Sequence, residues 1–267
     1  MALRTRILFV ATALGALLAL GACGKMDNGS DENGKQNLLD LLNREGKVYR
    51  DQQIKSTAMS RTMKYTVWLP GGYDSSKEYP FLYLLHGYGD DNNSWIDKGG
   101  ADRIARDYVN RGGTPMVIVM PDGLVNFYSG TWEKYFHEEL IPAVEKDFKC
   151  NGKRAVAGLS MGGYGTLYNV LNHPAKFTFG YAMSPATDLE GFEKLVTAQV
   201  SPSVFPPIVL ESGTQDFTVS IASVKEFSQM LTRHGVKHDM IERDGGHDWV
   251  FWPVCLEKAL SKVGETF

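Results

Sequence analysis

The segment AVAGLSMGGYG (residues 155–165) holds a serine between glycines, a pattern that can support nucleophilic chemistry. Its G-x-S-x-G core places Ser160 between Gly158 and Gly162, after an apolar run typical of a buried strand and before a helical segment. A strand, a tight turn and a helix in this order form a nucleophile elbow, which exposes a serine hydroxyl at the end of a sheet. We therefore predict that Ser160 is a nucleophile and that the N–H groups at the start of the following helix face developing negative charge.

A serine hydroxyl is a weak nucleophile at neutral pH and needs a base that accepts its proton. The chain has six histidines, and His247, in the loop sequence RDGGHDW, follows the last predicted strand. In the chain order of nucleophile, acid and base, the base belongs at this position. The remaining histidines lie at strand ends, in helices or in polar surroundings, where we expect structural roles; they are His86, His137, His173, His234 and His238.

The acid that orients this base must lie between the nucleophile and the base in the chain. Asp216 leaves a predicted strand in the stretch IVLESGTQDF and is well placed to hold the imidazole and stabilise its charged form. Glu211, Asp188 and Asp248 are the alternatives. Glu211 falls within the strand, Asp188 precedes a less regular segment, and Asp248 adjoins the base too closely to face its ring. We therefore predict Asp216 as the acid.

An acyl-transfer site also needs hydrogen-bond donors for an oxyanion. The sequence LLHGYGDD puts an H-G-x-G turn at the end of an earlier strand, and its glycines allow the loop to bend toward the serine. The backbone N–H groups of Tyr88 and Met161 are the predicted donors. The nucleophile, acid, base and oxyanion loop occur in the correct order, which predicts a serine hydrolase.

The composition excludes several other classes of protein. Hydrophobic residues make up 43% of the chain and aromatic residues 11%, which suits a packed globular core. The formal net charge of −3 offers no basic surface for nucleic acid. The sequence contains no zinc-type Cys/His spacing, no H-E-x-x-H and no Walker-type phosphate loop. We therefore expect chemistry without a metal or cofactor, and no nucleic-acid partner.

The first 22 residues have the features of a bacterial export signal. Arg4 and Arg6 precede an apolar run, Ile7–Leu20, that is too short to span a bilayer core, which takes about 20 residues. The run ends in Leu-Gly-Ala followed by Cys23, a sequence that resembles the lipobox of bacterial lipoproteins. We expect residues 1–22 to be removed and Cys23 to be lipidated, which would anchor the protein to a membrane on its periplasmic or cell-surface face. An ordinary signal peptide cleaved nearby is the alternative.

The rest of the chain divides into a tether and one domain. Residues 24–37 are polar, rich in Gly, Asn and Asp, and without periodicity, which predicts a flexible tether over residues 23–46. Residues 47–267 form the predicted catalytic domain. The domain contains two further cysteines, Cys150 and Cys255. Export to an oxidising compartment would permit a disulfide between them, and two free thiols are the alternative.

Strand and helix patterns alternate along this domain. An early pair of strand segments, residues 48–56 and 63–70, has no helix between its members and suits an antiparallel edge. Alternation in the rest predicts a mainly parallel sheet with helices on both faces. The further expected strands are 81–87, 116–123, 154–160, 177–185, 206–213 and 236–244, and the expected helices are 100–111, 132–148, 163–172, 219–233 and 248–263.

Four stretches of this sequence resemble one branch of the α/β-hydrolases over about residues 47–265: LPGGYDSSKEYPFLYLLHGYGDD, EELIPAVEKDF, GLSMGGYGTL and GGHDW. That branch contains feruloyl and acetylxylan esterases, tributyrin-type esterases, S-formylglutathione hydrolases and mycolyltransferases. The resemblance implies the α/β-hydrolase fold and a triad of Ser160, Asp216 and His247, in agreement with the residue-based analysis.

The substrate is less well specified by the sequence than the reaction. The domain leaves little room for a large lid, so we expect an open crevice for short acyl groups, or for an aromatic acyl group on a bulky carbohydrate. In the segment 122–132, Phe127, Tyr128 and Trp132 are candidates for holding the apolar acyl part, and the segment 189–206 is a second candidate wall.

Export favours esters of small molecules or oligosaccharides outside the cytoplasm over S-formylglutathione. Transfer of the acyl group to an alcohol acceptor by the same triad is one alternative. A non-catalytic binding lipoprotein with a hydrolase fold is another. The sequence does not specify an oligomeric state.

Overall fold

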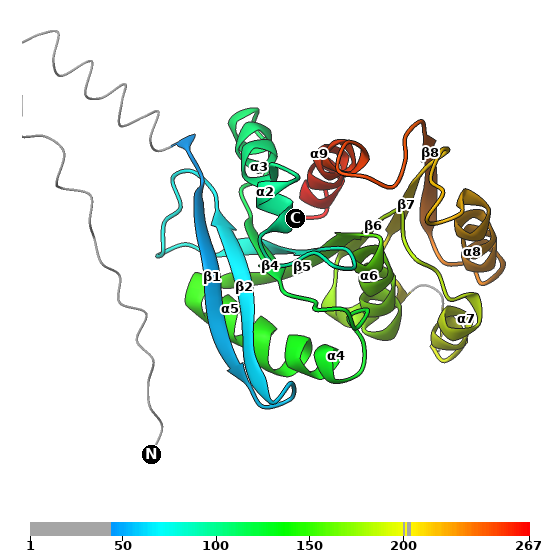
Figure 1. The fold of residues 1–267 in the computed structure, drawn as a ribbon. Helices are drawn as coiled ribbons and strands as arrows, with labels where there is room; N and C mark the ends of the chain where they lie inside the picture. Colours follow the sequence, from blue (N-terminus) through cyan, green and yellow to red (C-terminus); the bar gives the residue numbers. More distant parts are fainter. Residues whose placement is uncertain (1–43, 200, 202–203) are drawn as a thin grey trace, which may run out of the picture. The chain divides into compact units, whose positions relative to one another are not determined.

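The computed structural model describes residues 44–199, 201 and 204–267 (Figure 1). These residues contain an eight-stranded sheet with the order β1-β2-β4-β3-β5-β6-β7-β8. The strands are β1 (Lys47–Ser56), β2 (Arg61–Leu69), β3 (Tyr79–Leu85), β4 (Val117–Pro121), β5 (Cys150–Leu159), β6 (Phe179–Met183), β7 (Ile208–Gly213) and β8 (His238–Arg243).

The sheet is parallel except at one edge. Strand β2 pairs antiparallel with both β1 and β4, and every other pairing is parallel. The expected mainly parallel sheet with an antiparallel N-terminal edge is therefore confirmed.

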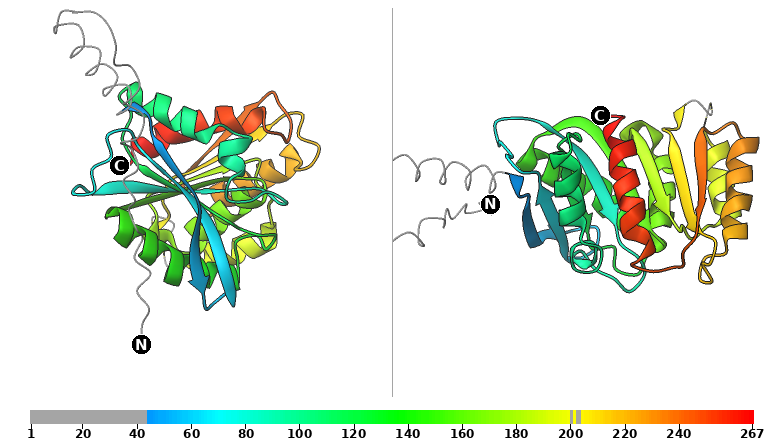
Figure 2. Two further views of the ribbon diagram at one scale, coloured as in Figure 1. Left: turned by 60° about the vertical axis from the view of Figure 1, so that its left-hand side comes forward. Right: turned by 90° about the horizontal axis from the view of Figure 1, so that it is seen from above.

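Helices cover both faces of the sheet (Figure 2). Helices α2, α3 and α9 pack on one face, and α4 to α8 with the π-helical turn η1 pack on the other. The bounds are α2 (Ser94–Asp97), α3 (Ala101–Asn110), α4 (Thr131–Tyr135), η1 (Phe136–Leu140), α5 (Ile141–Phe148), α6 (Met161–Asn172), the 3₁₀ turn η2 (Pro174–Lys176), α7 (Leu189–Thr197), α8 (Ile221–Arg233) and α9 (Phe251–Gly264).

The apolar sequence of β3 follows from this layering. All seven of its residues are buried. Phe81 and Tyr83 point into the core under α4 to α8, whereas Leu82 and Leu84 point into the core under α2, α3 and α9. A strand covered on both faces needs apolar side chains at successive positions, which is why its sequence does not alternate with polar residues.

Two helices, α2 and α7, were not predicted from the sequence. The segment 189–206, predicted as a candidate wall of the crevice, begins with α7. Asp188 is the N-cap of this helix, and its Oδ1 accepts the N–H of Gly191 at 3.1 Å. Asp188 is thereby committed to capping, which removes it as an alternative acid.

Both cysteines of the described domain are free thiols. Cys150 is half-buried at the start of β5, and Cys255 is fully buried in α9. Burial raises the pKa of Cys150 to about 11 and that of Cys255 to about 12. Of the two alternatives for this pair, the structure therefore shows the free thiols.

The predicted export signal, residues 1–22, lies outside the described residues, as do Cys23 and the tether up to residue 43. In the part of the chain that is described, no helix has the length and apolar character needed to cross a membrane.

A buried carboxylate joins β7 to β8 and α9. Glu211, on β7, is fully buried and accepts hydrogen bonds from Arg243 Nε at 3.0 Å, Lys258 Nζ at 2.7 Å and the hydroxyl of Tyr181. Arg243 Nη2 also donates to the carbonyl of Phe251 at 2.9 Å. Because Arg243 ends β8 and Phe251 begins α9, these bonds hold both ends of the loop that carries the predicted base.

Replacing Glu211 by Gln keeps the size of the side chain but leaves Arg243 and Lys258 without their counter-charge. We expect a loss of about 2 kcal/mol in the free energy of unfolding, measured in urea at pH 7, because a partly buried cation loses its partner. The control is Glu190→Gln, which removes an exposed ion pair with Lys194 and should change stability by less than about 0.5 kcal/mol. Equal effects of the two variants would contradict this role for Glu211.

The difference in stability between wild type and Glu211→Gln should also depend on pH. Burial alone would raise the pKa of Glu211, but its three hydrogen bonds outweigh burial and hold the pKa below the ordinary value of 4.5. A lowered folded-state pKa stabilises the fold above the unfolded-state pKa, and this contribution disappears as the pH falls through the folded-state value. The stability difference between the two proteins should therefore be full at neutral pH and shrink below about pH 4.5.

Candidate active site

Ser160 lies in the turn between β5 and α6, where its backbone is strained. Its φ of 53° and ψ of −113° lie in a region that non-glycine residues rarely adopt. A Cβ on Gly158 would lie 2.4 Å from the carbonyl oxygen of Gly162, and a Cβ on Gly162 would lie 2.5 Å from that of Leu85. The two glycines are therefore required because the turn passes against itself and against the end of β3.

The three residues predicted as a triad form one hydrogen-bonded chain. His247 Nε2 lies 2.9 Å from Ser160 Oγ, and His247 Nδ1 lies 2.7 Å from Asp216 Oδ2. The other oxygen of Asp216 accepts the N–H groups of Thr218 at 2.9 Å and Val219 at 2.8 Å. With both oxygens accepting, the carboxylate keeps the proton of the imidazole on Nδ1 and leaves the lone pair of Nε2 directed at the serine hydroxyl.

Within this hydrogen-bonded series, the predicted acid is buried and the predicted base is partly accessible to solvent. The side chain of Asp216 is 0% exposed and that of His247 is 13% exposed. The ring of Trp252 meets the imidazole edge to face at 5.0 Å. Trp249, two residues after the base, contacts Trp95 and Trp252. The imidazole is therefore held by one carboxylate and one indole, with Nε2 directed toward the reacting hydroxyl.

The loop after β3 lies beside the serine. A Cβ on Gly87 would lie 3.7 Å from the Cβ of Ser160, so the Tyr88 N–H that follows is close to the nucleophile. Met161 is the first residue of α6, and the N–H of a first helical residue has no partner within the helix. Both predicted oxyanion donors therefore belong to backbone segments next to Ser160.

His86 fixes the orientation of this loop, a role that the sequence did not reveal. The N–H of Gly123 donates to His86 Nε2 at 2.7 Å, so the proton of the neutral ring is on Nδ1, which lies 2.8 Å from the carbonyl oxygen of Gly87. The peptide bond between Gly87 and Tyr88 is trans, and a trans peptide points its C=O and N–H in opposite directions. By holding the carbonyl of Gly87, the ring directs the N–H of Tyr88 to the opposite side.

Two of the three aromatic residues predicted to contact substrate are buried. Tyr128 and Trp132 are both fully covered, so the expectation that they line the crevice is wrong. A Cβ on Gly165 would lie 2.6 Å from the ring of Tyr128, so the absence of a side chain on α6 makes the slot that this ring fills. The Tyr128 hydroxyl donates to the carbonyl of His86 at 2.9 Å, and Trp132 Nε1 donates to that of Asp122 at 3.0 Å.

Phe127, the third of these residues, remains at the surface. Its side chain is 38% exposed and contacts Tyr164 edge to face at 5.5 Å, with the ring of Tyr88 at 6.5 Å. Tyr164 lies one helical turn after Ser160 on α6, so its spacing from the serine was the sequence signal for its position. These three rings form an apolar surface next to the oxyanion loop.

The other histidines have structural partners. His137 Nε2 lies 2.8 Å from Asn169 Oδ1, and burial lowers the pKa of His137 to about 3. His173 contacts Glu133, His234 contacts Glu193, and His238 contacts Ser228. Within the described ranges, no group of three or more His, Cys, Asp or Glu side chains is arranged to hold a metal ion.

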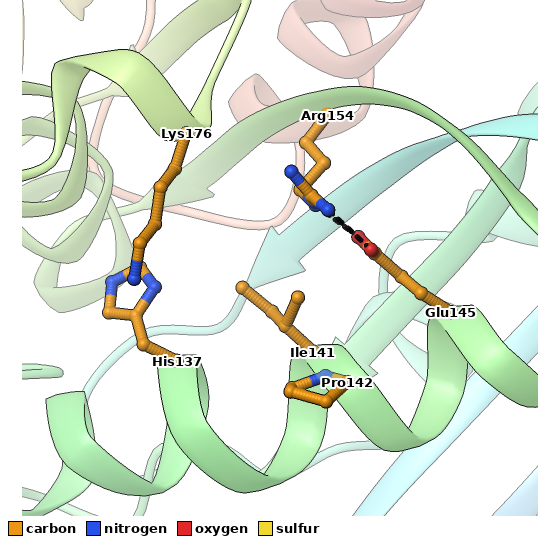
Figure 3. A pocket seen from close by; sticks show the side chains of 6 residues that line it. All are labelled: His137, Ile141, Pro142, Glu145, Arg154 and Lys176. Atoms are coloured by element: carbon orange, nitrogen blue, oxygen red, sulfur yellow. Dashed lines mark hydrogen bonds and ion pairs between the residues drawn. The ribbon is translucent and has the colours of Figure 1, made fainter.

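A separate cavity of about 320 Å³ lies away from the triad (Figure 3). Arg154 Nη2 and Glu145 Oε2, 2.6 Å apart, form an ion pair on one of its sides. Arg154 and Ser160 are separated by the remaining length of β5, about 20 Å of extended chain. The cavity is therefore remote from the reacting hydroxyl; its lining residues are His137, Ile141, Pro142, Glu145, Arg154 and Lys176.

Comparison with known proteins identifies the family. A family model described as "Putative esterase" matches residues 56–263. The chain belongs to this esterase family. The match includes the strained serine turn, the acid and base loops and the oxyanion loop described above.

The names of individual relatives describe feruloyl and acetyl esterases. "Endo-1,4-beta-xylanase/feruloyl esterase" of Xylanibacter ruminicola is 29% identical over 222 residues, which cover 76% of this chain but only 29% of that longer protein. "Acetyl esterase" of Caldicellulosiruptor saccharolyticus is 27% identical over 237 residues, covering 71% of this chain and 86% of that protein. A solved structure described as "ferulic acid esterase" has a TM-score of 0.76 at 28% identity, covering 84% of this chain and 99% of the other.

The esterase is therefore a carboxylic ester hydrolase with the α/β-hydrolase fold. The predicted α/β-hydrolase fold and the predicted class of enzyme, a carboxylic ester hydrolase, are both confirmed. Membership of an esterase family favours catalysis over the alternative of a non-catalytic binding protein.

The role of His86 can be tested with two substitutions in the esterase. His86→Ala removes both ring contacts, whereas His86→Asn keeps a side-chain N–H near the position of Nδ1. We expect His86→Ala to lower kcat by about tenfold to a hundredfold with less than about a threefold change in KM, because a misdirected oxyanion donor weakens transition-state binding more than substrate binding. The measurement is steady-state hydrolysis of p-nitrophenyl acetate.

His86→Asn should recover part of the lost kcat. If it is as slow as His86→Ala, or if KM rises as much as kcat falls, the ring does not act through the carbonyl of Gly87. Thermal unfolding of each variant separates this effect from a loss of folded protein.

Proposed function

We propose that this esterase hydrolyses short-acyl or feruloyl and acetyl esters of carbohydrates outside the cytoplasm, through an acyl-enzyme on Ser160. The observation that carries the proposal is the hydrogen-bonded chain from Asp216 through His247 to Ser160 Oγ, with distances of 2.7 and 2.9 Å. The strained backbone of the serine turn and the adjacent amides of Tyr88 and Met161 support the same reaction.

The acylation half-reaction uses all of these groups. Ser160 Oγ attacks the ester carbonyl carbon while His247 Nε2 takes the hydroxyl proton, and Asp216 stabilises the resulting imidazolium. The carbonyl oxygen becomes an oxyanion that accepts hydrogen bonds from the N–H groups of Tyr88 and Met161. His247 then returns the proton to the alkoxide oxygen, the bond from the carbonyl carbon to that oxygen breaks, and the alcohol leaves.

Deacylation repeats these steps with water. His247 takes a proton from the water molecule, whose oxygen attacks the acyl carbon, and a second oxyanion forms in the same place. When this intermediate collapses, His247 protonates Ser160 Oγ, and the carboxylic acid is released. The triad returns to its starting state and no further group is consumed.

The substrate class is supported by the apolar surface beside the oxyanion loop and by the names of the relatives. Phe127, Tyr164 and Tyr88 present aromatic rings next to the nucleophile, which suits an aromatic or short apolar acyl group. The relatives named above are described as feruloyl and acetyl esterases. The predicted export signal and lipobox favour an ester met at the cell surface or in the periplasm.

The first test compares wild type with Ser160→Ala on p-nitrophenyl acetate, butyrate and octanoate and on methyl ferulate. We expect wild type to hydrolyse the acetate and the ferulate, and Ser160→Ala to lose about four to six orders of magnitude in kcat, as removal of a triad serine does. Wild-type activity that survives this substitution would exclude Ser160 as the nucleophile. Absence of hydrolysis of every ester by wild type would overturn the proposed function.

Lipid anchoring is tested by Cys23→Ser in the producing bacterium. Wild type should appear in the membrane fraction with a diacylated N-terminal Cys23, detected by mass spectrometry of the N-terminal peptide. Cys23→Ser should move the protein into the soluble fraction, because one lipid-modified residue supplies the anchor. Membrane association that is unchanged in the variant would exclude Cys23 as the anchor.

A further inference from the structure

The loops that carry the acid and the base each display an apolar side chain to solvent. Phe217, directly after Asp216, is 98% exposed, and Val250, shortly after His247, is 82% exposed. A fully exposed phenylalanine lacks the stabilisation of about 1.5–3 kcal/mol that its burial would contribute to the fold. Neither Phe217 nor Val250 takes part in the mechanism above. These positions therefore need a reason other than folding.

Phe217 lies in a hydrogen-bonded turn. Asp216 Oδ1, just before the exposed ring in the chain, accepts the N–H groups of Thr218 and Val219, which follow it. The preceding residue is also fixed, because the N–H of Gln215 donates to the carbonyl of Gly245 in the base loop at 3.0 Å. The ring is thus presented at a defined place next to the triad.

The chemistry of the reaction determines which part of the ester lies beside the acid and base loops. In the tetrahedral intermediate, the carbonyl oxygen points to the N–H groups of Tyr88 and Met161, and the leaving oxygen must face His247 Nε2, which protonates it. The alcohol part of the ester therefore leaves past the acid and base loops. The acyl part occupies the remaining direction, away from His247.

The composition of these loops indicates which alcohol fits. Around Phe217, the exposed side chains Thr214, Gln215 and Thr218 are neutral and offer hydroxyl and amide groups. The sequences TQDFTVS (214–220) and DGGHDWV (244–250) contain no lysine or arginine but several aspartates. An anionic alcohol would be repelled, whereas a neutral alcohol with many hydroxyls can both hydrogen-bond and cover the ring.

We propose that Phe217, with Thr214, Gln215 and Thr218, forms the subsite for the alcohol part of the substrate and takes a neutral sugar ring. The C–H groups on one face of the sugar would lie on the negative face of the phenyl ring, and its hydroxyls would bind the three polar side chains. This inference rests on the proposed esterase function. It assigns specificity to the acid loop, in addition to the aromatic surface at the oxyanion loop.

The test uses two esters with the same acyl group. The full chain is assayed on methyl ferulate and on ferulate linked to an arabinose of a neutral xylo-oligosaccharide, and the result is the ratio of the two kcat/KM values. Phe217→Ala should lower the ratio of sugar ester to methyl ester by about fivefold, through a higher KM, as expected for loss of one aromatic contact. Phe217→Tyr, which keeps the ring, should retain most of the wild-type ratio.

The matched control is Val254→Ala. Val254 is also an exposed apolar residue, 40% exposed, but it lies in α9, outside the acid loop, the base loop and both candidate walls of the crevice. This variant should leave the ratio at its wild-type value. Because Phe217 is almost fully exposed, its substitution should also leave the melting temperature unchanged.

Each outcome has one meaning for the proposal. An unchanged ratio in Phe217→Ala, or an equal loss on both esters, would overturn the alcohol subsite while leaving the esterase function intact. If wild type hydrolyses neither ferulate ester but does hydrolyse p-nitrophenyl acetate, the feruloyl substrate and this subsite are both wrong. If wild type hydrolyses no ester at all, the proposed function fails, and the inference fails with it.

Discussion

The close approach of the β5–α6 turn to the end of β3 is the contact on which the site depends. Only glycine fits at Gly158 and Gly162, because a Cβ at either position would meet backbone atoms at 2.4–2.5 Å. That contact brings the oxyanion loop, which follows β3, to the side of Ser160. It also places the start of α6 next to the serine, so one steric constraint positions the proposed nucleophile and both of the proposed oxyanion amides. The strain at Ser160 is tolerated because the parallel sheet on either side determines the path of the chain.

The second set of contacts holds the base relative to this turn. The acid and base loops follow β7 and β8, and the Glu211 network ties both strands to α9. His247 therefore lies in a loop whose two ends are fixed by charge-assisted hydrogen bonds, while its ring is oriented by Asp216 and Trp252. The nucleophile and the base are positioned by different physical means. A steric contact positions the first and a buried ionic network positions the second.

Much of this could be predicted from the sequence, and the exceptions have identifiable causes. The mainly parallel sheet and the meeting of Ser160, Asp216 and His247 follow from the order of the motifs, because the carboxyl ends of parallel strands meet at one edge of the sheet. The direction of Tyr128 could not be predicted, since it depends on positive φ values at Phe127 and Tyr128 and on the slot at Gly165. The hydrogen-bond partners of Glu211 could not be predicted from the sequence either. The sequence shows a carboxylate within an apolar strand, but not that cations from β8 and α9 converge on it.

The two oxygens of Asp216 have different partners, and this limits what a common substitution can reveal. Oδ2 faces the imidazole, whereas Oδ1 closes the turn that carries Phe217. An asparagine at this position has only one acceptor oxygen, so its NH₂ group must face either an imidazole N–H or two backbone N–H groups. Removing the charge is thus inseparable from disturbing the loop, and a slow Asp216→Asn enzyme would not by itself measure the electrostatic contribution of the carboxylate.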